Sequence, residues 1–458
     1  MVPLLLAATT TAYASEDAIY GTVSNDRRAD TTLDTLVVVG NRGAKRAVIE
    51  SLVPIDVISG ADLLKQGGST DLRDALSRLL PSFNVATITG TVGYSNAARP
   101  ASLRGFGGGY LLVLVNGKRR HVGATQSENN TIFEGFGAAD LDFIPISAVD
   151  RVEVLRDGAA AQYGSDAVAG VVNIILKRDS EGVELTTMAG KRLHYSSDVD
   201  VDGETVQQTI GYGRTLGQDG FLHLALDAKH QEPTRRPVPA TQAFYWPING
   251  QPDPREATVN KMPVGGGLPE TTRITASWNA GLPLASGADF YSHGTLSKRD
   301  ATVGIGFRTV TSPSVIPELY PDGTTADFII KETDYQFTTG VNGTSVNQWR
   351  WDASASYGAN DMEHHSDKNM NASLGPASPT EFFLQGNELG LFSGNLDLSR
   401  RFGADSRVPF DFSWGLEYRR EDYRTRSGDP LSYANGGYVF PSGPLGGELG
   451  QVRALGNN

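Results

Sequence analysis

The second half of the chain contains nine stretches in which apolar and polar residues alternate over ten or more positions. In the stretch from residue 220 to 231, Leu224 and Leu226 fall on one side of an extended strand and Asp227 falls on the other. Strands of soluble sandwiches are usually about five or six residues long. Membrane barrels use strands of about ten residues, apolar outside and polar inside. The predicted strands cover residues 182–192, 205–216, 220–231, 272–282, 288–299, 334–345, 348–359, 390–401 and 408–421.

The connections between these strands alternate in length. Residues 216–220 and 345–348 are short connections, whereas residues 232–270, 300–333 and 360–389 are long ones. Membrane barrels have short turns at one end and longer loops at the other. This alternation of short and long connections therefore favours an antiparallel transmembrane β-barrel.

A compact α+β unit is predicted ahead of the barrel, over residues 49–178. Near its end, the apolar runs 152–155 and 168–176 flank a segment rich in Gly and Ala. Short apolar runs bounded by Gly are typical of buried strands. Earlier in the unit, Asn116-Gly117 follows the run YLLVLV and is the strongest short signal for a β-hairpin.

Two short helices are expected near the start of this unit. Ser59 and Asp62 have the spacing of a capping box, with Asp in place of the usual Glu, before a helix through Gln66. Ser69 or Thr70 is the expected cap of a second helix, which Pro81 ends. The apolar face of that helix consists of Leu72, Ala75, Leu76, Leu79 and Leu80.

The N-terminal residues are expected to serve export and contact with a partner. Residues 1–14 combine a short apolar core with an A-x-A sequence and are typical of a secretory signal peptide, although no basic residue precedes the core. Residues 15–48 are predicted to be flexible, apart from the β-prone residues 34–39. A tethered β-prone segment is suited to adding a strand to a partner's sheet; an ordinary first strand is the equally open alternative.

Several functional classes are disfavoured by composition. The chain has no Cys and a net charge of −12, so neither a thiolate metal site nor a basic nucleic-acid footprint is indicated. Gly105-Phe106-Gly107-Gly108-Gly109 precedes a strand, whereas a phosphate-binding loop opens a helix. His364 and His365 are candidates for binding a metal or ferric chelate, but we interpret them as solvated residues of a polar loop. No catalytic triad is readable, and neither an enzyme nor a cofactor is expected.

By these features the chain resembles the TonB-dependent outer-membrane receptors. Residues 34–38 resemble the TonB box of that family. The sequences LRGF from Leu103, LVLVNGKRR from Leu112 and RVEVLR from Arg151, continuing through Gly164 to Asn173-Ile174, resemble its plug domain. The sequence RDGAAAQYGSDA from Arg156 resembles a subfamily of large receptors.

The resemblance implies a plug inside a barrel of 22 strands, located in the outer membrane of a Gram-negative bacterium. Its function would be the import of a ferric siderophore or another large, scarce nutrient, energised by a TonB-type protein. The TonB box would consist of Asp34, Thr35, Leu36, Val37 and Val38. Arg104 and Arg156 would lock the plug to the barrel, with Glu417 as the candidate partner. Weaker candidates for ligand contacts are Tyr94, Asn96, Arg99, Gln126, Asn129 and Phe133.

The chain is too short for the whole of that architecture. Residues 182–458 provide roughly nine or ten strands, whereas 22 strands of ten residues need about 220 residues before any loop is counted. We therefore expect a partial barrel from a fragmentary or truncated receptor, in contact with outer-membrane lipid. The alternative function is a receptor that does not transport, or a surface β-protein that acts as a ligand-binding or interaction module.

Overall fold

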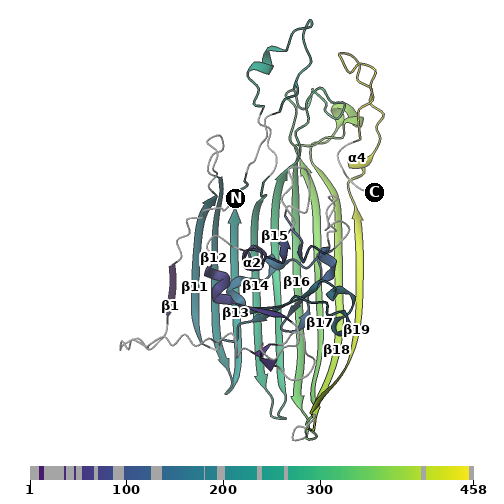
Figure 1. Ribbon diagram of the computed structural model, residues 1–458. Helices are drawn as coiled ribbons and strands as arrows, with labels where there is room; N and C mark the ends of the chain where they lie inside the picture. The colour runs from purple at the N-terminus through teal and green to yellow at the C-terminus, as the bar shows by residue number, and fades with distance from the viewer. Residues whose placement is uncertain are drawn as a thin grey trace.

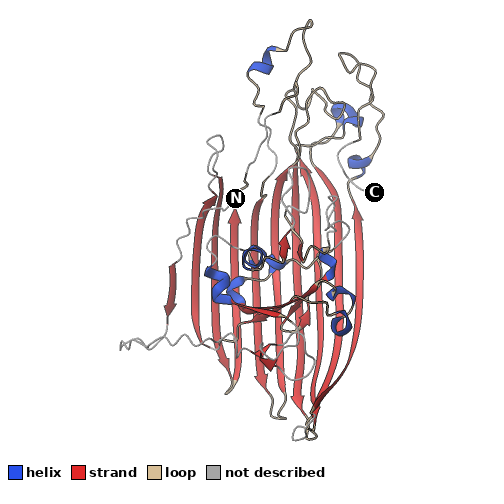
Figure 2. Cartoon of the chain, in the orientation of Figure 1, coloured by secondary structure: helices blue, strands red, loops and turns tan. Residues whose placement is uncertain are grey.

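A computed structural model describes two units, a long antiparallel sheet and an α+β domain that lies against one face of that sheet (Figure 1, Figure 2). The described residues are 54–65, 71–85, 97–124, 137–179, 181–192, 202–234, 240–261, 267–403 and 409–452, together with the backbone of residues 10–14, 36–37 and 46–47. In Figure 1 the long connections gather at the top of the sheet and the short ones at the bottom.

All nine predicted long strands are present, and each pairs antiparallel with the next in the chain. They are β11 (Glu181–Arg192), β12 (Asp202–Leu216), β13 (Gly220–Gln231), β14 (Glu270–Pro283), β15 (Asp289–Gly304), β16 (Asp327–Thr344), β17 (Arg350–Asp367), β18 (Phe382–Phe402) and β19 (Phe410–Ser427). The later strands run further toward the long connections than predicted. The apolar alternation fades there, but the main-chain ladder continues through 18 paired positions between β16 and β17.

One consequence of these longer strands corrects the interpretation of the two histidines. His364 and His365 do not lie in a polar loop but within β17. His364 is completely buried, because it points to the inner side of the sheet between Met362 and Ser366, which are buried as well. Among the described residues, no group of His, Asp or Glu has the arrangement of a metal site.

In the long sheet, polar side chains are buried on the inner face and apolar side chains are exposed on the outer face. This is the reverse of the usual arrangement in a soluble protein. On β13, the inward side chains of Asp227 and Lys229 are 0% and 5% exposed, whereas the outward Leu224 and Leu226 are 40% and 44% exposed. The same contrast recurs along the sheet, where the exposed outward residues include Val206, Ile210, Ile274, Leu296, Phe337, Tyr357, Phe392, Trp414, Leu416 and Tyr418. In the described part of the chain, no helix is long and apolar enough to cross a bilayer.

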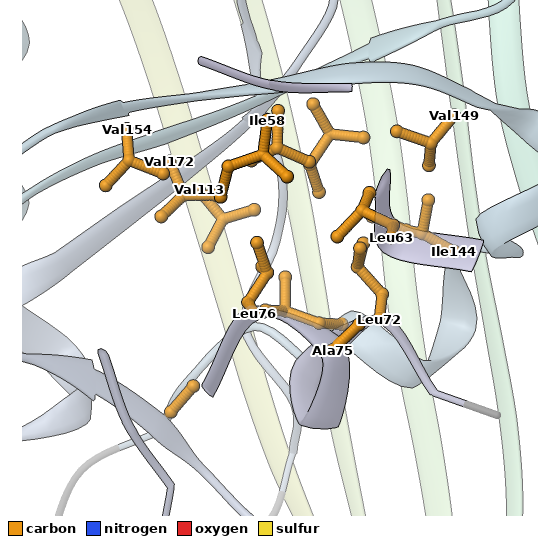
Figure 3. Packing of buried hydrophobic residues seen from close by; sticks show 14 of the residues in the cluster. Ile58, Leu63, Leu72, Ala75, Leu76, Val113, Ile144, Val149, Val154 and Val172 are labelled. Atoms are coloured by element: carbon orange, nitrogen blue, oxygen red, sulfur yellow. The ribbon is translucent and has the colours of Figure 1, made fainter. Parts of the chain in front are cut away.

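The α+β domain is built on a five-stranded sheet in the order β4-β9-β10-β7-β8. Its elements are β4 (Ile55–Ser59), α1 (Gly60–Lys65), α2 (Leu72–Leu79), β5 (Phe83–Val85), β6 (Ala101–Leu103), β7 (Leu111–Val115), β8 (Lys118–Arg119), β9 (Val149–Leu155), α3 (Ala160–Tyr163) and β10 (Gly170–Leu176). Leu72, Ala75 and Leu76 of α2 pack against Val113 and Val172 of the sheet (Figure 3). The apolar face predicted for this helix is therefore the one that it buries.

Most of the predictions made from short sequence motifs in this domain are confirmed. Asn116 and Gly117 have φ values of 49° and 81°, as expected for a tight hairpin turn between β7 and β8. The Ser59 hydroxyl accepts a hydrogen bond from the Asp62 amide at 3.1 Å, as in a capping box. The cap predicted for α2 was wrong, because the N-cap is Asp71 rather than Ser69 or Thr70.

The N-terminal predictions concern residues that are described only in part. Residues 10–14, within the predicted signal peptide, form β1 (Thr10–Ala14) beside β11. Leu36 and Val37 of the predicted TonB box form β2 (Leu36–Val37), which pairs with β3 (Arg46–Ala47). The remaining residues of both segments lie outside the described part of the chain.

The glycine at the start of β10 is required by two independent constraints. Gly170 has a φ of 146°, and a Cβ atom there would lie 2.4 Å from the Leu155 carbonyl oxygen and 2.6 Å from Leu103 Cδ2. We expect Gly170→Ala to lower the free energy of unfolding of the α+β domain by about 2 kcal/mol or more. Urea titration of the full chain in detergent, with pulse proteolysis monitored at residues 54–178, measures this change. Gly394→Ala in β18 is the matched control, because no atom lies within 4 Å of its added Cβ. Equal losses for the two variants would contradict the prediction.

Candidate functional site

The interface between the α+β domain and the inner face of the long sheet is the candidate site. It is built from charged side chains that are removed from water. A buried charge is costly unless an opposite charge or hydrogen-bond partners compensate it. The contacts therefore come in pairs and small networks, and in most of them the partners lie on opposite sides of the interface.

The first network surrounds Asp71, the N-cap residue of α2. Its carboxylate accepts hydrogen bonds from Lys229 of β13 at 2.7 Å and from Arg273 of β14 at 2.8 Å. Burial by itself raises the pKa of Asp71, but Lys229, Arg273 and Arg73 together hold that pKa well below its usual range. The ionised carboxylate of Asp71 therefore binds the inner face of the long sheet, which we call the wall. Its side chain makes no hydrogen bond to its own helix, although it occupies the capping position.

Two further carboxylates complete this network. Arg273 also donates to Asp227 of β13 at 3.3 Å. Within the α+β domain, Arg73 pairs with Asp142 at 2.7 Å. The side chains of all these charged groups are at most 8% exposed.

The second network is centred on Arg299 of β15. Its Nη1 donates to Asp140 of the α+β domain at 2.7 Å, and its Nε donates to Glu332 of β16 at 3.0 Å. The guanidinium also lies 4.6 Å from the centre of the Phe143 ring, a cation–π arrangement. Because the Arg299 side chain is 2% exposed, these partners replace its hydration.

The third network follows the β7–β8 hairpin. Arg120 binds Asp334 of β16 and donates to Thr295 of β15 at 2.7 Å. Next to it, the backbone amide of His121 donates to the Gln336 side chain at 3.2 Å. The amide of Ala124 donates to Asn360 of β17 at 2.8 Å. Wall side chains thus satisfy backbone groups as well as charges.

The fourth network is more open. Lys118 binds Asp352 of β17 at 2.6 Å, and Arg119 binds Asp166 at 2.5 Å. Arg419 of β19 reaches the same Asp166 at 3.1 Å. Asp352 and Asp166 are 26% and 35% exposed. Beside this network lies a cavity of about 550 Å³, lined by the β7–β8 hairpin and by residues of β16 to β19.

The predicted locking residues take different partners from those expected. Arg156 pairs with Asp56 at 2.7 Å, inside the α+β domain. Arg104 donates to the backbone carbonyls of Ala169 and Val168. Glu417 does face the domain, but its partner is Arg119, at 3.6 Å. Neither predicted arginine is placed against Glu417.

The candidate ligand contacts are mostly outside the described residues. Tyr94, Asn96, Gln126, Asn129 and Phe133 belong to that group. Arg99 is described; its side chain donates to Asp74 at 3.2 Å, and its backbone carbonyl accepts from Arg73. In this structure Arg99 therefore organises the α+β domain.

Sequence reasoning missed Asp71, Arg120 and Asp140 as contact residues. A usable signal was present in the wall, because charged residues such as Asp227, Arg273 and Arg299 recur on the polar side of long alternating strands. The partners that Asp71, Arg120 and Asp140 have on the long sheet are 158 to 214 positions away in the chain. The contacts that join the α+β domain to the long sheet are noncovalent, and they can therefore break and form again.

Removing Arg299 tests whether these networks hold the two units together. Arg299→Ala leaves Asp140 and Glu332 buried without their cation, so we expect the free energy of unfolding to fall by about 3–5 kcal/mol. Urea titration of the full chain in detergent, with pulse proteolysis of residues 54–178, measures this loss. The combination of Arg299→Met, Asp140→Asn and Glu332→Gln should recover much of it.

Arg420→Ala is the matched control for Arg299→Ala. Arg420 pairs with Asp422 on the exposed surface of β19, where water replaces the lost contact. We expect no shift of its urea midpoint. A shift equal to that of Arg299→Ala would rule out a special role for the buried networks.

Comparisons with known proteins agree with this arrangement. Residues 47–171 match the family model of the TonB-dependent Receptor Plug Domain. The fold resembles the ferric enterobactin receptor PfeA of Pseudomonas aeruginosa, with a TM-score of 0.55 and 15% identity over 83% of this chain and 50% of that chain. It also resembles BauA, the ferric preacinetobactin receptor of Acinetobacter baumannii, with a TM-score of 0.50 and 15% identity over 83% of this chain and 60% of that chain. The chain thus spans half to three fifths of the length of these two receptors. The family match thus covers residues 47–171, and this part of the chain is similar to a TonB-dependent receptor plug domain.

Proposed function

We propose that the chain acts in a TonB-dependent receptor of the outer membrane, which imports a ferric siderophore or another large, scarce nutrient. The observation that carries this proposal is a plug domain attached by buried charges to the inner face of a sheet whose outer face is apolar and exposed. A plug domain is expected only where the wall of a barrel encloses a lumen that the domain can fill. An exposed apolar face suits a wall that stands in lipid.

The membrane location rests on the outward side chains. Leu224, Ile274 and Leu416 are 40%, 53% and 61% exposed, and each lies within a long strand. Contiguous apolar surface of this kind is unfavourable in water and favourable in a bilayer. The opposite face of each strand carries the polar groups, as the lumen of a membrane barrel requires.

The buried networks explain why such a receptor needs an energy source. Moving the plug away from Lys229, Arg273 or Arg299 separates the carboxylates of Asp71 and Asp140 from buried cations of the wall. Thermal motion rarely supplies that free energy, because each broken buried pair costs several kcal/mol. In our proposal, a TonB-type protein adds the strand of residues 34–39 to its own sheet and transmits force to the plug.

The ligand class is proposed from the similar structures. PfeA is described as a ferric enterobactin receptor and BauA as a ferric preacinetobactin receptor. We propose a ligand of the same broad kind, a ferric siderophore. It would enter from the end with the long connections and need no covalent chemistry.

Deleting residues 34–39 separates transport from binding. We expect energy-dependent uptake to disappear while ligand binding at the cell surface remains, because the deletion removes only the attachment point for the energy-transducing partner. Uptake of ⁵⁵Fe from a panel of catecholate, hydroxamate and citrate chelates, with and without a proton uncoupler, provides the measurement. Deletion of residues 24–29, a polar segment of the same length, is the control. Unchanged uptake without residues 34–39 would disprove energised import, and binding without uptake in the unmodified protein would favour a binding module.

A further inference from the structure

An apolar groove crosses the outer face of β15 to β19, in the half of the sheet that is nearer the short connections at the bottom of Figure 1. Its volume is about 640 Å³. The floor consists of the small residues Ala353, Ala355 and Gly394, and Ala355 pairs directly with Gly394. A Cβ atom on Gly394 would meet no atom within 4 Å, so the space above the floor is open.

Larger apolar side chains border this floor. Leu396 of β18 pairs with Leu416 of β19, and Gly394 pairs with Tyr418. Phe392 adds an aromatic ring on the side of the long connections. Strands of membrane barrels are tilted by about 35–45°. A groove that crosses such strands is therefore also inclined to the membrane normal, and an acyl chain can follow it.

Arg400 is a cation on the same outer face. It lies two outward positions beyond Leu396 on β18 and pairs with Phe412 of β19. Its guanidinium lies 4.7 Å from the centre of the Phe402 ring and 6.0 Å from that of the Trp349 ring. Its Nε atom is buried and has no hydrogen-bond partner among the described residues. Within the described part of the chain, the partners of this guanidinium are thus aromatic rings rather than carboxylates.

The position of Arg400 suits the headgroup level of a lipid leaflet. The strand ends at Phe402, so Arg400 lies close to the end of the sheet that has the short connections. Aromatic rings are enriched at this level of membrane proteins, and lipid phosphates are the anions found there. The four residues from Leu396 to Arg400 span about 13 Å, which is less than the roughly 15 Å of hydrocarbon in one leaflet. The cation and the groove therefore fall within a single leaflet.

We propose that Arg400 and the groove form a binding site for a glycerophospholipid of the leaflet at the short connections. The guanidinium of Arg400 donates to the phosphodiester, and one acyl chain lies over Ala353, Ala355 and Gly394. Arginine suits this role because its planar group can donate to two phosphate oxygens at once. A charge beside hydrocarbon is also costly until it has a partner. The inference rests on the proposed membrane location and is independent of the transported ligand.

Native mass spectrometry of the full chain in detergent, titrated with palmitoyl-oleoyl phosphatidylglycerol, measures the affinity for this lipid. We expect one tightly retained lipid molecule. Arg400→Gln should weaken its retention by about tenfold or more, because the charge-assisted contact is lost. Gly394→Phe should weaken it similarly, because the new ring fills the groove while Arg400 stays in place. Neither change is expected to unfold the sheet, because both side chains face outward near the membrane interface.

Arg214→Gln is the matched control for Arg400→Gln. Arg214 is exposed on the outer face of β12, opposite Leu222, and lies two residues from the end of that strand at the short connections. All the residues that line the groove belong to β15 to β19. Arg214→Gln should therefore leave retention unchanged. Diacylglycerol, which lacks the phosphate, and glycerol phosphate, which lacks the chains, should each bind the unmodified protein about tenfold more weakly or worse.

The proposal is overturned if Arg400→Gln or Gly394→Phe retains the lipid as tightly as Arg214→Gln does. It is also overturned if glycerol phosphate binds as well as the lipid, which indicates an anion site alone. A dimer that Gly394→Phe dissociates without loss of lipid would place a second copy of the chain in the groove instead. Flotation with phosphatidylglycerol vesicles separates this inference from the proposed function. A chain that floats but shows no difference between the two arginine variants refutes only the lipid site, whereas a chain that does not float refutes the membrane location as well.

Discussion

The inner face of the long sheet buries charges that it cannot compensate alone, and the rest of the structure depends on this constraint. Lys229 and Arg273 share the carboxylate of Asp71, and Arg299 is divided between Asp140 of the plug and Glu332 of the wall. Because buried ion pairs add little net stability over apolar packing, their main effect is to fix where the plug lies.

The same constraint explains how one sheet serves two surroundings. Each long strand places apolar residues outward and polar residues inward, so period-two alternation alone gives one sheet an apolar face and a polar face. The outer face requires only hydrophobicity, and many residues satisfy it. The inner face requires particular partners at particular positions, as Asn360 illustrates by binding a plug amide as well as Glu332 and Asp334. We therefore expect substitutions inside the wall to be less tolerated than substitutions outside it.

The local sequence pattern was sufficient to predict the strands and helices. The contacts between the α+β domain and the long sheet could not be predicted from it. The nine strands, the Asn116-Gly117 hairpin and the apolar face of α2 follow from periodicity and turn chemistry, which act over a few residues. The ends of β16 to β19 were missed because the main-chain ladder continues where alternation stops. Arg104 and Arg156 were expected to bind the wall because the family resemblance implies such pairs, yet Arg156 binds Asp56 within the α+β domain. The sequence indicated Ser69 or Thr70 as the cap of α2, and only the folded arrangement places Asp71 at that position and against two cations of the wall.

The distance along the chain between plug and wall partners has a consequence for assembly. Asp71 and Arg273 are 202 positions apart, and Lys118 and Asp352 are 234 apart, whereas each wall strand pairs with its immediate successor. Wall hairpins with short connections, such as β12–β13, are expected to form early, while contacts of long sequence separation form late. The plug is also synthesised before any of its wall partners. We therefore expect its charged side chains to stay hydrated until the wall strands are in place, and to lose that water late in assembly.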